Sequence, residues 1–157
     1  ASLIINNLSK KGETLSVAES CTGGGLAAAL TSVPGASKVF RGGIIAYSNL
    51  IKEGILNIDR YLLETEGAVS NPVVMAMAQE VKKKFETDWS IAISGVAGPS
   101  GGTPNKPVGF VQFCINGPNT TKIQAENFGP YRSRDDIQKL SVLKGLDQLR
   151  LSLLSQS

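Results

Sequence analysis

A serine at position 20 is the residue of this chain whose type and neighbours most clearly suggest chemistry. It lies in Ala-Glu-Ser-Cys-Thr-Gly-Gly-Gly (residues 18–25), directly after an apolar run, and the chain contains no histidine. A Ser-His-Asp triad is therefore impossible, and a nucleophilic Ser20 would need a lysine, a tyrosinate or a carboxylate as its base. Lys52, in Tyr-Ser-Asn-Leu-Ile-Lys (residues 47–52), is a good candidate for that base.

A lysine acts as a base only when its amine is neutral. At an unperturbed pKa of roughly 10.4, only about one molecule in a few thousand is neutral at pH 7, so the pKa would have to fall by about 3 units. Burial or a second nearby cation can produce a shift of that size. From the sequence alone, an ordinary surface residue before a turn is the more common role for a lysine such as Lys52. Tyr47 could relay a proton between Ser20 and Lys52, or could simply be an aromatic residue at the end of a strand.

The glycines after Ser20 predict a helix that begins near Thr22, with its first backbone N–H groups pointing at Ser20. Such N–H groups, from Thr22, Gly23 and Gly24, could hold a phosphate or an oxyanion. A structural alternative stays open, in which Ser20 or Thr22 only caps the helix. The glycines also match a dinucleotide fingerprint weakly, because the next strand ends without the expected acidic residue.

A second glycine-rich loop, residues 95–107, is too dense in glycine for a routine connection between elements. Its backbone N–H groups can turn inward and form an anion-binding nest. An arginine suits phosphate better than a lysine, because its planar guanidinium can bind two oxygens at once. Each cation could instead be exposed to solvent. The candidates are Gly98, Gly101, Gly102 and Thr103 for the loop, and Lys106, Arg132 and Arg134 for the cation.

Composition places the chain among globular proteins. It has 157 residues, of which 41% are hydrophobic and 18% charged, so we expect a single domain over residues 1–157, which could be cut from a longer protein. A net charge of +3 suits an anionic small molecule and gives no support for nucleic acid. Cys21 and Cys114 form no metal-ligand pattern, and we expect neither metal nor cofactor. No membrane span or signal peptide is apparent, which predicts a cytoplasmic protein.

Helical and strand patterns alternate and then give way to a hairpin, which predicts a three-layer α/β/α sandwich around a mixed sheet. We expect strands at 15–18, 40–47, 89–94, 108–115 and 122–128, and the main helices at 3–11, 22–31, 70–85 and 135–154. Ligands bind beyond the carboxyl ends of strands in open α/β sheets. From this topology, the polar or glycine-rich loops 19–25, 47–52, 94–107 and 129–134 could share one cleft.

Four motifs in order resemble a known family. They are residues 18–24, residues 47–49 with Lys52, residues 67–70 and residues 94–109. Together they resemble the C-terminal domain of CinA proteins, a family also called nicotinamide-nucleotide amidohydrolase or NMN deamidase. The resemblance covers nearly the whole chain. It implies hydrolysis of the carboxamide of nicotinamide mononucleotide to nicotinate mononucleotide and ammonia, without a cofactor.

Carried over to this sequence, the resemblance implies Ser20 as nucleophile and Lys52 as general base, with Tyr47 close by. The family arginine follows Phe-x-Gly-Asp-Arg, whereas residues 128–134 lack the aspartate, so Arg132 and Arg134 both remain candidates. A second arginine that is common in the family is replaced here by Gln138.

The resemblance further implies a homo-oligomer, and many members carry a fused N-terminal domain. The alternative function is a nucleotide-binding or regulatory module without catalysis, and a third possibility is an assembly role in DNA uptake.

Overall fold

The computed structural model describes residues 1–155 and contains a five-stranded mixed sheet in the order β2-β1-β3-β4-β5. The strands are β1 (Leu15–Glu19), β2 (Phe40–Ile45), β3 (Trp89–Gly95), β4 (Phe110–Gly117) and β5 (Thr120–Asn127). β1 pairs in parallel with β2 on one side and β3 on the other, whereas β4 and β5 continue the sheet in antiparallel fashion.

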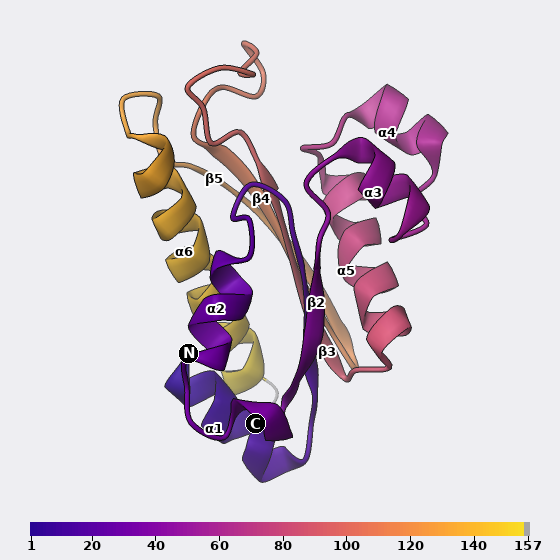
Figure 1. Cartoon of the computed structure of the whole chain (residues 1–157), viewed down its shortest axis with the longest axis vertical. Coiled ribbons are helices and arrows are strands. Elements are labelled where there is room, and N and C mark those ends of the chain that lie inside the picture. Colours follow the sequence, from indigo (N-terminus) through magenta and orange to yellow (C-terminus); the bar gives the residue numbers. More distant parts are fainter. Residues whose placement is uncertain (156–157) are drawn as a thin grey trace.

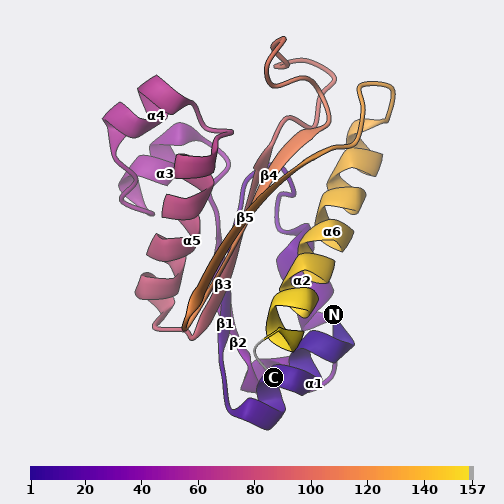
Figure 2. The ribbon, with the colours of Figure 1, turned by 180° about the vertical axis from the view of Figure 1, so that it is seen from behind.

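Helices cover both faces of this sheet (Figures 1 and 2). One layer contains α1 (Ser2–Lys11), α2 (Gly25–Thr31) and α6 (Arg134–Leu154), and the other contains α3 (Asn49–Gly54), α4 (Arg60–Glu66) and α5 (Asn71–Phe85). A short 3-10 turn, Ala36–Lys38, precedes β2. The predicted three-layer sandwich around a mixed sheet is therefore confirmed.

Alternation of side chains along the central strands creates two cores. In β3, Ile91 and Ile93 pack into the core beneath α1, α2 and α6, while Ala92 between them belongs to the core beneath α5. β1 repeats the pattern with Val17 and Ala18, since successive side chains of a strand point to opposite faces. The small residues on the α5 side let that long helix lie close to the sheet.

The largest difference from the expected elements lies directly after Ser20. The sequence predicts a helix from Thr22, but α2 begins at Gly25. Gly23 and Gly24 adopt positive φ angles of 59° and 101°, which are outside the helical region, so residues 20–24 form turns instead. β2 also ends earlier than expected, at Ile45, so Tyr47 lies in the following loop rather than in the strand.

Candidate active site

The three parallel strands end in step at one edge of the sheet. Glu19, the last residue of β1, pairs with Ile45 of β2 and Ile93 of β3. Ser20 follows immediately, and its N–H donates to the carbonyl oxygen of Ile93 at 2.9 Å. This register places the loops after all three strands around a pocket of about 290 Å³. Its lining includes Ser20, Cys21, Tyr47, Asn49, Lys52, Ser94, Gly98, Gly101 and Arg134.

Ser20 and Lys52 meet at the base of this pocket. The hydroxyl of Ser48 accepts a hydrogen bond from Ile51 N–H and caps α3, the short helix that carries Lys52. The Lys52 side chain turns inward, is 1% exposed, and has its Nζ 3.2 Å from Ser20 Oγ. A second N–H of Lys52 donates to the carbonyl oxygen of Ala46 at 2.7 Å. The amine is therefore oriented by the backbone and directed at the serine hydroxyl.

Burial also decides the charge of this amine. Removal from water lowers the pKa of Lys52 to about 8, because the ammonium form loses its hydration. At that pKa about one molecule in ten is neutral at pH 7. The neutral amine has a lone pair that can accept the Ser20 proton while one of its N–H groups stays bonded to Ala46. The arrangement can thus activate a serine without histidine.

The neighbouring thiol is not a competing nucleophile. Cys21 is buried, and burial raises its pKa to about 12. The thiolate is the reactive form of cysteine, so this side chain stays protonated and unreactive at neutral pH. Of these two adjacent side chains, the Ser20 hydroxyl is therefore the candidate nucleophile.

The backbone N–H groups that follow Ser20 divide into two sets. Gly23 N–H donates to Ser20 O at 3.1 Å and closes a turn. The fully buried carboxylate of Glu19 accepts from the N–H groups of Gly24, Leu26 and Ala27 at 2.8–3.1 Å. The first N–H groups of α2 thus bind a residue of the protein itself, so they are not available to a ligand.

Cys21 and Thr22 provide the remaining N–H groups of this loop. Within residues 1–155, neither N–H donates to another residue, and both belong to the turn that begins at Ser20. Of the three residues expected to hold an oxyanion, Thr22 therefore keeps a free N–H, whereas Gly23 and Gly24 have theirs engaged. The sequence did not predict the free N–H of Cys21 or the binding of Glu19 to the start of α2. For Glu19, the signal in the sequence was an acidic residue directly before Ser20.

Arg134 connects two of the loops at the entrance to the pocket. As the first residue of α6, it donates to the carbonyl oxygen of Gly98 at 2.7 Å and to the hydroxyl of Tyr47 at 2.5 Å. Two of its five N–H groups are used in this way, so three remain for a ligand. Arg132, in contrast, is exposed and donates to Phe128 O, away from the residues that line the pocket.

Only some of the other predicted residues line the pocket. Tyr47 is 58% exposed, lies at the pocket rim, and within the described residues has Arg134 as its hydroxyl partner rather than Ser20 or Lys52. Gly98 and Gly101 line the pocket, but Gly102 and Thr103 do not. Lys106 donates to the carbonyl oxygen of Glu66 and is likewise outside the lining.

Ser94 and Asn49 line the pocket, although sequence reasoning assigned neither of them a role. Ser94 is 1% exposed, and its hydroxyl donates to Ala68 O at 2.7 Å, which ties the end of β3 to the loop before α5. Their position in the motifs at residues 47–49 and 94–109 was the signal that could have identified them.

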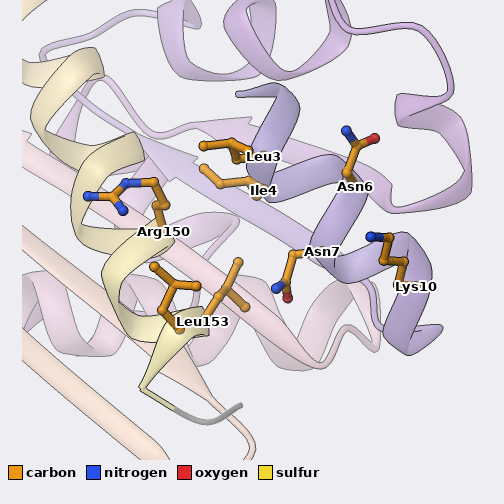
Figure 3. A pocket seen from close by; sticks show the side chains of 8 residues that line it. Leu3, Ile4, Asn6, Asn7, Lys10, Arg150 and Leu153 are labelled. Atoms are coloured by element: carbon orange, nitrogen blue, oxygen red, sulfur yellow. The ribbon is translucent and has the colours of Figure 1, made fainter.

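Other features of the structure lie apart from this chemistry. A second pocket, of about 280 Å³, lies between α1 and α6 and is lined by Leu3, Ile4, Asn7, Leu153 and neighbouring residues (Figure 3). None of the residues of the serine–lysine site contributes to it. Across residues 1–155, no group of three or more histidine, cysteine, aspartate or glutamate side chains could hold a metal ion. None of the helices in that same range is both long and apolar enough to span a bilayer.

Fold and pocket together define an α/β-sandwich protein with a buried serine–lysine pair at the carboxyl ends of its parallel strands. The model of the CinA C-terminal domain family matches residues 1–153, and the chain belongs to that family. It is 60% identical over 155 residues to a CinA-like protein of Prochlorococcus marinus, and 55% identical over 157 residues to one of Parasynechococcus marenigrum.

These relatives are much longer than the chain. The alignments include 99% and 100% of this chain but only 37% and 38% of the two relatives. Solved structures agree in fold. A CinA superfamily protein from Klebsiella pneumoniae 700603 matches with a TM-score of 0.93 and 30% identity, covering 98% of this chain and 95% of that one. The competence/damage-inducible protein CihA from Agrobacterium tumefaciens gives a TM-score of 0.91 and 34% identity, over 96% and 90%.

Proposed function

We propose that this chain is a serine amidohydrolase that converts nicotinamide mononucleotide to nicotinate mononucleotide and ammonia. The observation that carries the proposal is the buried Lys52 Nζ, 3.2 Å from Ser20 Oγ, in a pocket at the strand ends. A buried lysine without a carboxylate partner is costly to maintain, and activation of an adjacent hydroxyl is a chemical reason for its presence. The resemblance of the motifs supplies the substrate.

Acylation begins with neutral Lys52. Its lone pair takes the proton of Ser20 Oγ as the oxygen attacks the carboxamide carbon, giving a tetrahedral intermediate and a charged ammonium on Lys52. Collapse of the intermediate breaks the C–N bond, and Lys52 returns the proton to the departing nitrogen, which leaves as ammonia. The nicotinoyl group is now an ester of Ser20. The N–H groups of Cys21 and Thr22 are the donors available for the oxyanion.

Deacylation reverses these roles with water. Lys52 is neutral again and takes a proton from a water molecule that attacks the ester carbon. The bond to Ser20 Oγ breaks, the oxygen recovers the proton from Lys52, and the nicotinate product leaves. The phosphate of the nucleotide would bind the free N–H groups of Arg134 beside the Gly98 loop. Lys52 thus carries one proton in each half-reaction.

The test is ammonia release and nicotinate mononucleotide formation by the purified chain, beside the Ser20→Ala variant. Turnover by the wild type that disappears in the variant, with an unchanged circular dichroism spectrum, supports both the reaction and its nucleophile. Undiminished activity in Ser20→Ala would remove Ser20 from the mechanism. Binding of the nucleotide without ammonia release by the wild type would favour the alternative, a nucleotide-binding module without catalysis.

The same proposal includes a cytoplasmic location, where a nucleotide substrate is available, and the homo-oligomeric state that is usual in the family. Because the relatives are longer, any further domain would join this one as a partner in the same chain. Light scattering on the purified chain measures the oligomeric state directly.

A further inference from the structure

A side chain from the far end of the sequence holds the loop that follows Ser20. The Nε2 amide of Gln138, in the second turn of α6, donates to the carbonyl oxygen of Cys21 at 2.8 Å, across a separation of 117 residues. The contact is partly buried, and Gln138 lies outside the lining of the serine–lysine pocket. Gln138 therefore touches the loop from behind and does not face a ligand in the pocket.

The geometry of a trans peptide gives this contact a consequence. The carbonyl of Cys21 and the N–H of Thr22 belong to one planar unit and point in opposite directions. Because the carbonyl is directed at α6, the Thr22 N–H is directed away from α6. α3 lies on the opposite side of the sheet from α6 (Figures 1 and 2). Ser20 Oγ is hydrogen-bonded to Lys52, which α3 carries.

The other hydrogen bonds of this loop do not involve the Cys21–Thr22 peptide. Ser20 N–H is fixed to β3, Gly23 N–H closes the turn on Ser20, and Gly24 N–H is bound to Glu19. Within residues 1–155, the Cys21–Thr22 peptide has Gln138 as its hydrogen-bond partner from outside the loop.

We infer that Gln138 is a positioning residue that fixes the Cys21–Thr22 peptide so that the Thr22 N–H faces the oxyanion formed at Ser20. This inference rests on the proposed function, since it assigns a role in the same acyl transfer. A preorganised donor costs no reorientation when negative charge develops, so loss of the restraint should act on the transition state more than on substrate binding.

Three variants test the donor itself. Gln138→Met keeps the approximate length of the side chain without a donor, Gln138→Glu keeps its shape but replaces the donor with a carboxylate, and Gln138→Arg keeps an N–H donor. We expect the Met and Glu variants to lower kcat for ammonia release about 10- to 100-fold, with KM changed less than about twofold. Gln138→Arg should recover most of the lost kcat. The pH midpoint of the Met variant should match that of the wild type.

A matched control comes from the neighbouring residue. Lys139 is exposed and paired with Asp135, so Lys139→Met should leave kcat and the melting temperature close to wild type. The inference is wrong if Gln138→Met and Gln138→Glu keep wild-type kcat, if KM rises in place of the fall in kcat, or if Gln138→Arg is as impaired as Gln138→Met. If Gln138→Met does not fold, the comparison of Glu with Arg decides.

A substrate-independent measurement separates failure of this inference from failure of the proposed substrate. The rate at which a fluorophosphonate labels Ser20 depends on the nucleophile and the oxyanion donors, not on recognition of a nucleotide. If the wild type is labelled but releases no ammonia, the proposed substrate is wrong, and the labelling rates alone test Gln138. In that case Gln138→Met and Gln138→Glu should be labelled more slowly than wild type, and Gln138→Arg should recover most of the rate. If wild-type Ser20 does not label at all, the positioning role falls together with the nucleophile.

Discussion

The proposed role of buried Lys52 as a base predicts how turnover should depend on pH. With the pKa lowered to about 8, the neutral fraction of the amine is about 9% at pH 7, about 50% at pH 8 and about 91% at pH 9. If Lys52 must be neutral to accept the Ser20 proton, kcat/KM should rise about tenfold between pH 7 and pH 9 and then level off. An unburied lysine would instead give a rise that continues beyond pH 10.

The assay should measure nicotinate mononucleotide by chromatography, because that readout does not depend on a coupling enzyme with its own pH profile. Values of kcat/KM report groups of the free enzyme, which is the state that the structure describes. The Ser20→Ala variant provides the background of uncatalysed hydrolysis at each pH. A profile that is flat between pH 7 and pH 9, or that falls over this range, would refute Lys52 as the base.

Three further variants test individual contacts. Lys52→Met should abolish turnover but unfold at higher temperature than wild type at pH 7. Because the folded pKa of Lys52 is below its unfolded value, wild-type stability rises from about pH 8 to about pH 10.4. In thermal melts, the stability difference between the variant and the wild type should therefore shrink by up to about 3 kcal/mol over this range. A stability difference that stays constant across this pH range would contradict the lowered pKa of Lys52. Glu19→Gln leaves one acceptor oxygen for three N–H donors and should destabilise the fold by about 2–3 kcal/mol in urea unfolding; a loss below about 0.5 kcal/mol would show that the buried carboxylate is not the anchor of α2. Arg134→Lys should raise KM for the nucleotide at least about tenfold in steady-state kinetics, because a lysine cannot bridge Gly98 and Tyr47 and also bind phosphate. The same change at exposed Arg132 should have little effect on KM. Equal effects at both positions would argue against Arg134 as the phosphate-binding residue.

Local pattern was sufficient for most of the fold. Hydrophobic periodicity located the strands and the long helices, and Ser70, where the helix over 70–85 was expected to begin, caps α5. The order of elements then predicted the three layers. The largest error lies where glycine permits more than one backbone path. Gly23 and Gly24 could continue a helix or form turns, and only the packed loop, with Glu19 bound to the start of α2, selects the turns.

For the candidate site, too, the sequence determined some properties and the tertiary structure determined others. The sequence by itself determined that a reactive serine here would have to work without histidine, and that its partners would come from loops at the strand ends. Tertiary structure decided the rest. The pKa of Lys52 depends on burial by elements remote in sequence, the preference for Arg134 over Arg132 depends on where α6 begins, and the contact of Gln138 with Cys21 depends on the packing of that helix against the loop. These properties arise from desolvation and from distances between distant segments, and neither is encoded in local sequence pattern.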